Sequence, residues 1–104
     1  MQTPAEMTTM PEIRAGIDRL DRALIALLAE RAAHIDRAAQ IKARTGLPAR
    51  IDVRVEEVVA NVRRAAVAEG LSPDLAEDLW RRLIDWSIAR EECHLRAVSE
   101  KESR

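Results

Sequence analysis

The chain has 104 residues, with 17 basic and 18 acidic side chains, a formal net charge of -1 and only two aromatic residues. This length predicts a single domain over residues 1–104, with an aliphatic core that suits helices. The near-neutral charge gives no overall field that would attract nucleic acid or an anionic membrane, so any anion site must be local.

The first predicted helix covers residues 11–45. Pro11 suits a first helical turn, and no further proline or clustered glycine follows until Gly46 and Pro48. Such a helix is about 50 Å long, and the two shorter helices that follow cannot cover its inner face. We therefore expect a homodimer with antiparallel or intertwined long helices, in which both chains surround any shared cavity. The alternative is a monomeric bundle with a broken first helix.

The second predicted helix begins at Asp52 as its N-cap and ends near Glu69, with Gly70 as the stop. The third begins at Ser72-Pro73, because serine caps helices and proline fits the first helical position, and it runs to about residue 98. No period-2 alternation is long enough for a strand, so the fold class is all-α. The chain ends, residues 1–9 and 99–104, are expected to be frayed.

Two cations continue the apolar stripe of the first helix. The Ile and Leu spacing that starts at Ile13 and reaches Leu27 leads next to Arg31 and then to Lys42. These two cations are eleven positions apart, which leaves them about 20° from one another on the helix wheel. Burying two charges is costly unless they are compensated, so either internal carboxylates or an anionic ligand must accompany them.

The third helix carries polar groups in a comparable position. Trp80, Ile84, Ser87 and Glu91 follow the spacing of a single face, so an inward apolar stripe ends in a hydroxyl and a carboxyl group. Glu91 either neutralises one of the two cations inside the bundle or belongs to a ligand site. The spacing alone gives these two interpretations equal weight.

The number of charges favours the anion site. Arg14, Arg31, Lys42 and Arg54 outnumber the one inward carboxyl group of Glu91. Arg54 lies in the first turn of the second helix, where free backbone N–H groups also favour an anion. Arg14 lies about 100° around the helix from Arg31 and would face a different cavity, which in a two-fold dimer is the partner's.

Motifs of other function classes are absent from the sequence. It has no GxGxxG, P-loop, paired CxxC or HExxH motif. His34 and His94 are too far apart to form a local metal-ligand pair, so we expect no metal. Arg63-Arg64 and Arg81-Arg82 are adjacent pairs whose members point about 100° apart, and we interpret them as solvated helix surface rather than a nucleic-acid stripe.

The single Cys93 cannot form an internal disulfide, and its expected role is inert packing. No apolar run is long enough to span a membrane, and no secretory signal is recognisable at the N-terminus. We therefore expect a cytoplasmic protein.

Taken together, these residues resemble the all-helical chorismate mutase family. The resemblance is carried by the run Ile13-Arg14-Ala15-Gly16-Ile17-Asp18-Arg19-Leu20-Asp21, then Leu28-Ala29-Glu30-Arg31, then Lys42 and then Arg54. It covers nearly the whole chain and includes all three helices. The opening Thr3-Pro4 and the IDRLD run place the sequence close to the isochorismate-pyruvate lyase branch of that family.

The resemblance implies an intertwined homodimer with two equivalent sites, each binding a dicarboxylate enol ether. The implied reaction is the rearrangement of chorismate to prephenate, which needs no cofactor, metal or nucleophile. Catalysis would come from holding the reactive diaxial conformer and stabilising negative charge on the ether oxygen. The implied roles are carboxylate binding by Arg31 and Arg54 of one chain and Arg14 of the other, contact with the ether oxygen by Lys42 and Glu91, and lining of the pocket by Ser87.

Three positions depart from the family pattern. Many bacterial mutases have glutamine in place of Glu91, and a glutamate must be protonated to donate a hydrogen bond. Activity is therefore expected to be highest on the acidic side, as in fungal mutases with glutamate there. Val55 and Ile51 stand where many mutases have a substrate-binding glutamate and an aspartate. The apolar side chain of Val55 cannot bind the substrate hydroxyl group as that glutamate does, which favours the lyase branch.

The sequence leaves three functions open. The first is chorismate mutase, and the second is isochorismate-pyruvate lyase or a mutase of an amino-substituted chorismate that uses the same cations. The third is a non-catalytic helical dimerisation or regulatory module, in which the cations would be compensated internally.

Overall fold

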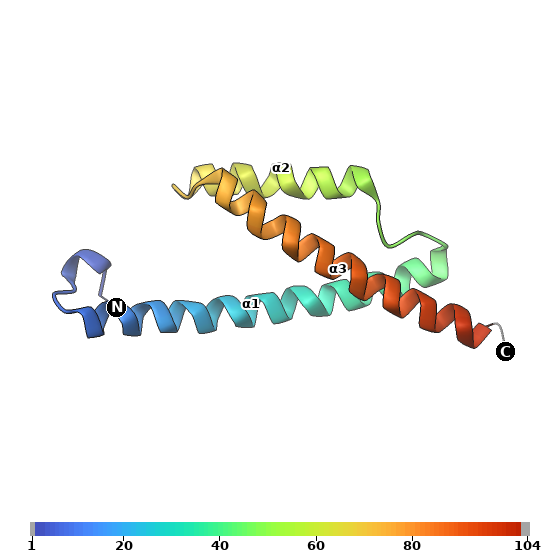
Figure 1. Ribbon diagram of the computed structural model, residues 1–104, viewed down its shortest axis with the longest axis horizontal. Coiled ribbons are helices and arrows are strands. Elements are labelled where there is room, and N and C mark those ends of the chain that lie inside the picture. The colour runs from blue at the N-terminus through green and yellow to red at the C-terminus, as the bar shows by residue number, and fades with distance from the viewer. Residues whose placement is uncertain (1, 103–104) are drawn as a thin grey trace. The chain divides into compact units, whose positions relative to one another are not determined.

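The computed structural model describes residues 2–102 and is all-helical over this range (Figure 1). A short 3-10 turn, η1 (Pro4–Glu6), precedes three α-helices: α1 (Met10–Thr45), α2 (Asp52–Ala68) and α3 (Pro73–Glu102). The predicted all-α class and long first helix are confirmed. No break interrupts α1, so the broken first helix that the monomeric alternative requires is not found.

Local sequence signals set the ends of α1. Thr9 Oγ1 accepts from the Glu12 N–H at 3.4 Å and donates to Glu12 Oε1 at 2.9 Å, so Thr9 caps the helix, which begins one residue before the predicted start. The predicted stop is correct. Gly46 follows Thr45 with a φ of +72°, and the Leu47 N–H donates to the Lys42 carbonyl at 3.1 Å.

The start of α2 differs from the prediction. Asp52 is the first helical residue, and Ile51 is the N-cap, without a side-chain cap hydrogen bond. The reason is that the Arg54 and Val55 N–H groups donate to the Ile51 carbonyl at 3.0 and 3.1 Å, so the helical ladder begins there. Asp52 still suits its place, because a carboxylate in the first turn is favoured by the helix dipole.

The turn between α2 and α3 follows the sequence signals. Gly70 adopts a φ of +75° after α2, as its predicted role as a stop requires. Ser72 Oγ accepts from the Leu75 N–H at 3.2 Å, which confirms the cap of α3. The third helix continues to Glu102, beyond the predicted end at residue 98. Of the residues expected to be frayed, Met1, Ser103 and Arg104 lie outside the described range.

The chain divides into two compact units, one ending at Ala33 and the other beginning at His34. In the first unit, the Met7 side chain covers Gly16, which is buried. In the second unit, the core is a small aliphatic cluster of Ala49, Val59, Ile84 and Ile88, with Val55, Val58 and Leu95 packed against it. This cluster contains no aromatic side chain, as the composition predicts.

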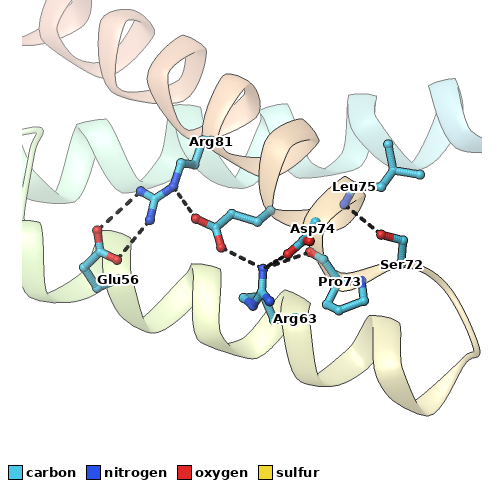
Figure 2. Close-up of polar contacts among 8 residues, drawn as sticks. Glu56, Arg63, Ser72, Pro73, Asp74, Leu75 and Arg81 are labelled. Carbon is cyan, nitrogen blue, oxygen red and sulfur yellow. Dashed lines mark hydrogen bonds and ion pairs between the residues drawn. The ribbon is translucent and has the colours of Figure 1, made fainter.

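An ion-pair network joins α2 to α3 in the second unit (Figure 2). Arg81 donates to both carboxylate oxygens of Glu56 at 3.2 and 3.3 Å and to Glu77 at 2.8 Å. Arg63 donates to Glu77 at 2.9 Å and to Asp74 at 3.0 Å. Hydrogen bonds from Arg81 and then from Arg63 lower the pKa of Glu77 from its ordinary value of 4.5. These two arginines therefore pair across helices, whereas the sequence interpretation left them as solvated surface.

Most of the apolar stripe of α1 in the first unit is exposed. Ile13 is half-buried, but between half and three-fifths of the surface of each of the next four residues is accessible: Ile17 (51%), Leu20 (57%), Leu24 (56%) and Leu27 (59%). A continuous row of large aliphatic side chains in water is unusual for a soluble protein and marks an interaction surface.

Candidate active site

The structure brings Lys42 and Glu91 together, although they are far apart in sequence. Lys42 lies in the last turns of α1 and Glu91 in the middle of α3, and Lys42 Nζ is 2.8 Å from Glu91 Oε1. The Glu91 side chain is 5% exposed and that of Lys42 is 17% exposed. The pair is therefore taken largely out of water, where charges attract strongly but are costly to bury.

Lys42 and Glu91 differ in their hydrogen bonds. Lys42 Nζ donates to the Ala49 carbonyl at 2.8 Å. Its contact with Glu91 is an ion pair that is not aligned as a hydrogen bond, and among the described residues Glu91 Oε1 has no hydrogen-bond partner. A buried carboxyl oxygen of this kind is rare, because burying a polar atom without a hydrogen bond costs free energy.

Ser87 lies one helical turn before Glu91 on the same face of α3. Both residues are buried, at 3% and 4% exposure, and Ile84 and Ile88 lie beside them in the aliphatic cluster. Ser87 Oγ donates to the Leu83 carbonyl at 2.7 Å. The inward apolar stripe of α3 therefore ends in the buried hydroxyl of Ser87 and the buried carboxyl group of Glu91, as the sequence spacing predicts.

Arg54 and Val55 occupy the first turn of α2. Arg54 is exposed and forms an ion pair with Glu57 one turn along the helix. Val55 is half-buried and packs against the aliphatic cluster. The Arg54 guanidinium is thus held by an exposed surface pair, which is weak and easily exchanged for another anion.

Arg14 and Arg31 belong to the first unit of the chain, where Arg14 is exposed and Arg31 is half-buried. Of the seven predicted site residues, the structure joins Lys42 directly to Glu91 and places Ser87 on the same face of α3. The participation of Arg14, Arg31, Arg54 and Val55 stays a prediction.

A second contact between α1 and α3 was not predicted from sequence. Arg90 donates to Asp36 with two nitrogens, one of them 3.0 Å from Oδ2, and its guanidinium lies 5.3 Å from the centre of the Trp86 ring. The hydrogen bond from Arg90 lowers the pKa of Asp36. These residues line an open groove of about 730 Å³ that also includes Cys93 and His94. No sequence signal links charges 54 positions apart.

The described part of the chain has neither a metal-binding cluster nor a membrane-spanning helix. No group of three or more His, Cys, Asp or Glu side chains within residues 2–102 is arranged to hold a metal ion. None of the helices over the same residues is sufficiently long and apolar to cross a membrane.

Comparison with known proteins decides the family. The sequence model for chorismate mutase type II matches residues 13–92, which include Lys42 and Glu91. The chain belongs to the chorismate mutase type II family. The resemblance inferred from the sequence motifs is therefore confirmed.

Individual relatives of this chorismate mutase type II chain carry two different names. It is 38% identical over 87 residues to the T-protein of Enterobacter agglomerans and 35% identical over 85 residues to that of Haemophilus influenzae. These matches cover 84% and 82% of the chain but only 22% of each T-protein, so the chain spans about a fifth of their length. It is also 32% identical over 92 residues to the isochorismate pyruvate lyase of Pseudomonas aeruginosa, covering 88% of the chain and 89% of the lyase.

Proposed function

We propose that this chain is a chorismate mutase that rearranges chorismate to prephenate in one concerted step. Membership of the family supports chorismate as the small-molecule substrate. The observation that carries the proposal is the buried pair of Lys42 and Glu91, in which Glu91 Oε1 has no hydrogen-bond partner among residues 2–102. A buried polar atom without a hydrogen-bond partner is rare enough to require an explanation, and a role in binding or catalysis is one.

In the proposed mechanism, the protein supplies charge and geometry and no nucleophile. Lys42 donates to the ether oxygen as negative charge develops there during C–O bond cleavage. Arg31, Arg54 and the partner's Arg14 hold the two substrate carboxylates in the reactive conformer. The exposed pair between Arg54 and Glu57 supports this assignment, because replacing it by a substrate carboxylate costs little.

The proposed enzyme is a homodimer. The row formed by Ile17, Leu20, Leu24 and Leu27 is exposed along α1, and the same row of a second copy would cover it. A two-fold pairing of long helices buries both rows at once. Under this proposal Arg14 serves the site of the other subunit.

A second candidate is isochorismate-pyruvate lyase, which uses the same cations. Val55, the residue that follows Arg54 in the sequence, favours this function. Its apolar side chain packs against the aliphatic cluster and offers no polar group to a substrate hydroxyl. The similarity to the Pseudomonas aeruginosa lyase, which extends along most of both chains, also favours it. A mutase of an amino-substituted chorismate would require the same cations.

The decisive experiment incubates the purified protein separately with chorismate and isochorismate and identifies the products. Prephenate from chorismate is expected. The Lys42→Met variant should lose roughly 10²–10³ in kcat/KM, the loss typical of removing one donor to a developing oxyanion. Arg44→Met is the matched control, because Arg44 is an exposed cation in the same last turn of α1. Its kcat/KM should stay within about twofold of the wild type.

The other outcomes separate the alternatives. Salicylate and pyruvate from isochorismate, without prephenate from chorismate, would establish the lyase instead. No turnover of either compound would refute both enzymatic proposals and leave a non-catalytic helical dimerisation module. Equal losses in Lys42→Met and Arg44→Met would show that the site does not depend on Lys42.

The protonation of Glu91 has its own test. In the ion pair with Lys42, Glu91 is a carboxylate, which would repel the ether oxygen, whereas the amide of glutamine in the same position can donate to it. If Glu91 contacts the ether oxygen, Glu91→Gln should change the pH profile of kcat. An unchanged profile would rule out the proposed role of Glu91.

A further inference from the structure

The loop between α1 and α2 is held by a hydrogen bond and by burial of one of its residues. Gly46 turns the chain with a φ of +72°, and the Leu47 N–H donates to the Lys42 carbonyl at 3.1 Å. Ala49, three residues after Gly46, is only 7% exposed and belongs to the aliphatic cluster with Ile84. The loop is therefore fixed to the end of α1 by a hydrogen bond and to α3 by burial.

The same loop contacts the ammonium group of Lys42. The Ala49 carbonyl accepts from Lys42 Nζ at 2.8 Å, and Glu91 Oε1 is 2.8 Å from the same nitrogen. An ammonium group has three N–H donors, and the Ala49 carbonyl accepts from one of them. The Lys42 side chain retains 17% exposure, so it is not fully enclosed by the protein.

We propose that Ala49 is a positioning residue for the reaction, acting through Lys42. Its main-chain carbonyl holds the end of a flexible four-carbon side chain, and its buried methyl group holds the carbonyl in place. The proposal rests on the proposed function, since it concerns the cation assigned to the ether oxygen. It makes the backbone of the loop part of the preorganised site, with Gly46 as the residue that directs the loop back toward Lys42.

This role differs from simple core packing in what it predicts. If Ala49 only fills the cluster, disturbing the loop lowers stability and leaves the chemistry of the folded enzyme unchanged. If Ala49 positions Lys42, disturbing the loop lowers kcat and has little effect on KM, because the interaction with the ether oxygen is strongest in the transition state.

The first experiment detects the hydrogen bond without using activity. Protein carrying carbonyl-13C alanine and 15N arginine gives an amide signal only from Ala-Arg steps, of which the sequence has three, ending at Arg44, Arg50 and Arg90. The Ala49–Arg50 signal is compared between Glu91→Gln and the double variant Lys42→Met/Glu91→Gln, so that no unpaired carboxylate is buried. Loss of the ammonium donor should move the Ala49 carbonyl resonance upfield and leave the Ala89–Arg90 signal in place. An unmoved Ala49 resonance would overturn the proposal.

The second experiment uses two glycines as a matched pair. Gly46 and Gly70 both have positive φ, and a Cβ on either would have no atom within 4 Å, so alanine imposes similar backbone strain at both. Gly46→Ala should lower kcat about tenfold with KM within about twofold, as expected for a slightly misplaced catalytic group. Gly70→Ala should leave kcat unchanged, and Gly46→Asn should restore much of it because asparagine tolerates this conformation.

The outcomes separate this proposal from the proposed function. Equal kcat values for Gly46→Ala and Gly70→Ala would overturn the positioning role, even in an active enzyme. A wild-type protein that converts neither chorismate nor isochorismate would refute the proposed function. In that case the response of the Ala49 carbonyl to Lys42→Met would still decide whether the loop holds the ammonium group.

Discussion

Replacing Lys42 by methionine tests the energetics of the buried pair. Methionine matches the length of the lysine stem but leaves Glu91, whose side chain is 5% exposed, without its cation. Removing one partner of a fully buried pair costs about 3–5 kcal/mol. Because the Lys42 side chain is 17% exposed, we expect the lower end, about 3 kcal/mol of unfolding free energy. The double variant Lys42→Met/Glu91→Gln buries a neutral amide instead of an unpaired charge, so it should lose less than Lys42→Met, about 1 kcal/mol.

The assay is urea unfolding followed by circular dichroism of the helices. All variants are compared at one protein concentration, because the stability of the proposed dimer would depend on it. The expected signature is non-additivity, with Lys42→Met far less stable than the double variant. If Lys42→Met and the double variant are equally stable, Glu91 is not a buried charge that depends on Lys42, and the reasoning fails.

Three further predictions concern the dimer, the α2–α3 network and the substrate. Arg14→Ala and Lys42→Met chains, each inactive alone, should recover about one quarter of wild-type activity when they are unfolded and refolded together. Half of the dimers then contain one chain of each kind, and each of these mixed dimers has one intact site out of two. No recovery would show that Arg14 does not serve the partner's site. Because the pKa of Glu77 is lowered on folding, its carboxylate stabilises the fold at pH values above the ordinary pKa of 4.5, and this stabilisation is lost as the pH falls through the pKa of the folded state. Glu77→Gln should therefore make the urea midpoint depend less on pH in acid. An unchanged dependence would contradict this prediction. Val55→Glu should raise kcat/KM for chorismate relative to isochorismate, and an unchanged ratio would remove Val55 from substrate recognition.

Local patterns in the sequence predicted most of the helical architecture. The Ser72-Pro73 signal and the Gly70 stop are correct because capping and positive φ depend on neighbouring residues alone. The pairing of Lys42 with Glu91 was among the sequence interpretations for a similar reason. Each breaks an apolar helical stripe, and polar groups that replace core residues on two helices must compensate each other or a shared ligand.

Ion pairs that are only partly buried were not predictable in the same way. Asp36 and Arg90, and likewise Arg63 and Glu77, are charged residues in a chain with 17 basic and 18 acidic side chains, and neither interrupts an apolar pattern. Their partners are selected by how the helices pack, which helical periodicity does not specify. The N-cap of α2 was assigned wrongly because Asp52 has the favoured side chain, whereas the backbone ladder begins at Ile51.

The two ion pairs that join α1 to α3 contribute differently. The pair of Asp36 and Arg90 is about half exposed, and its alignment can fix the helices at little desolvation cost. The buried pair of Lys42 and Glu91 is a poor way to stabilise a fold, since apolar side chains of similar volume would serve as well or better. This weakness as a stabilising device supports the catalytic role proposed for the pair. A stable Lys42→Met/Glu91→Gln protein without turnover would separate the two roles, because it would retain the fold and lose only the chemistry.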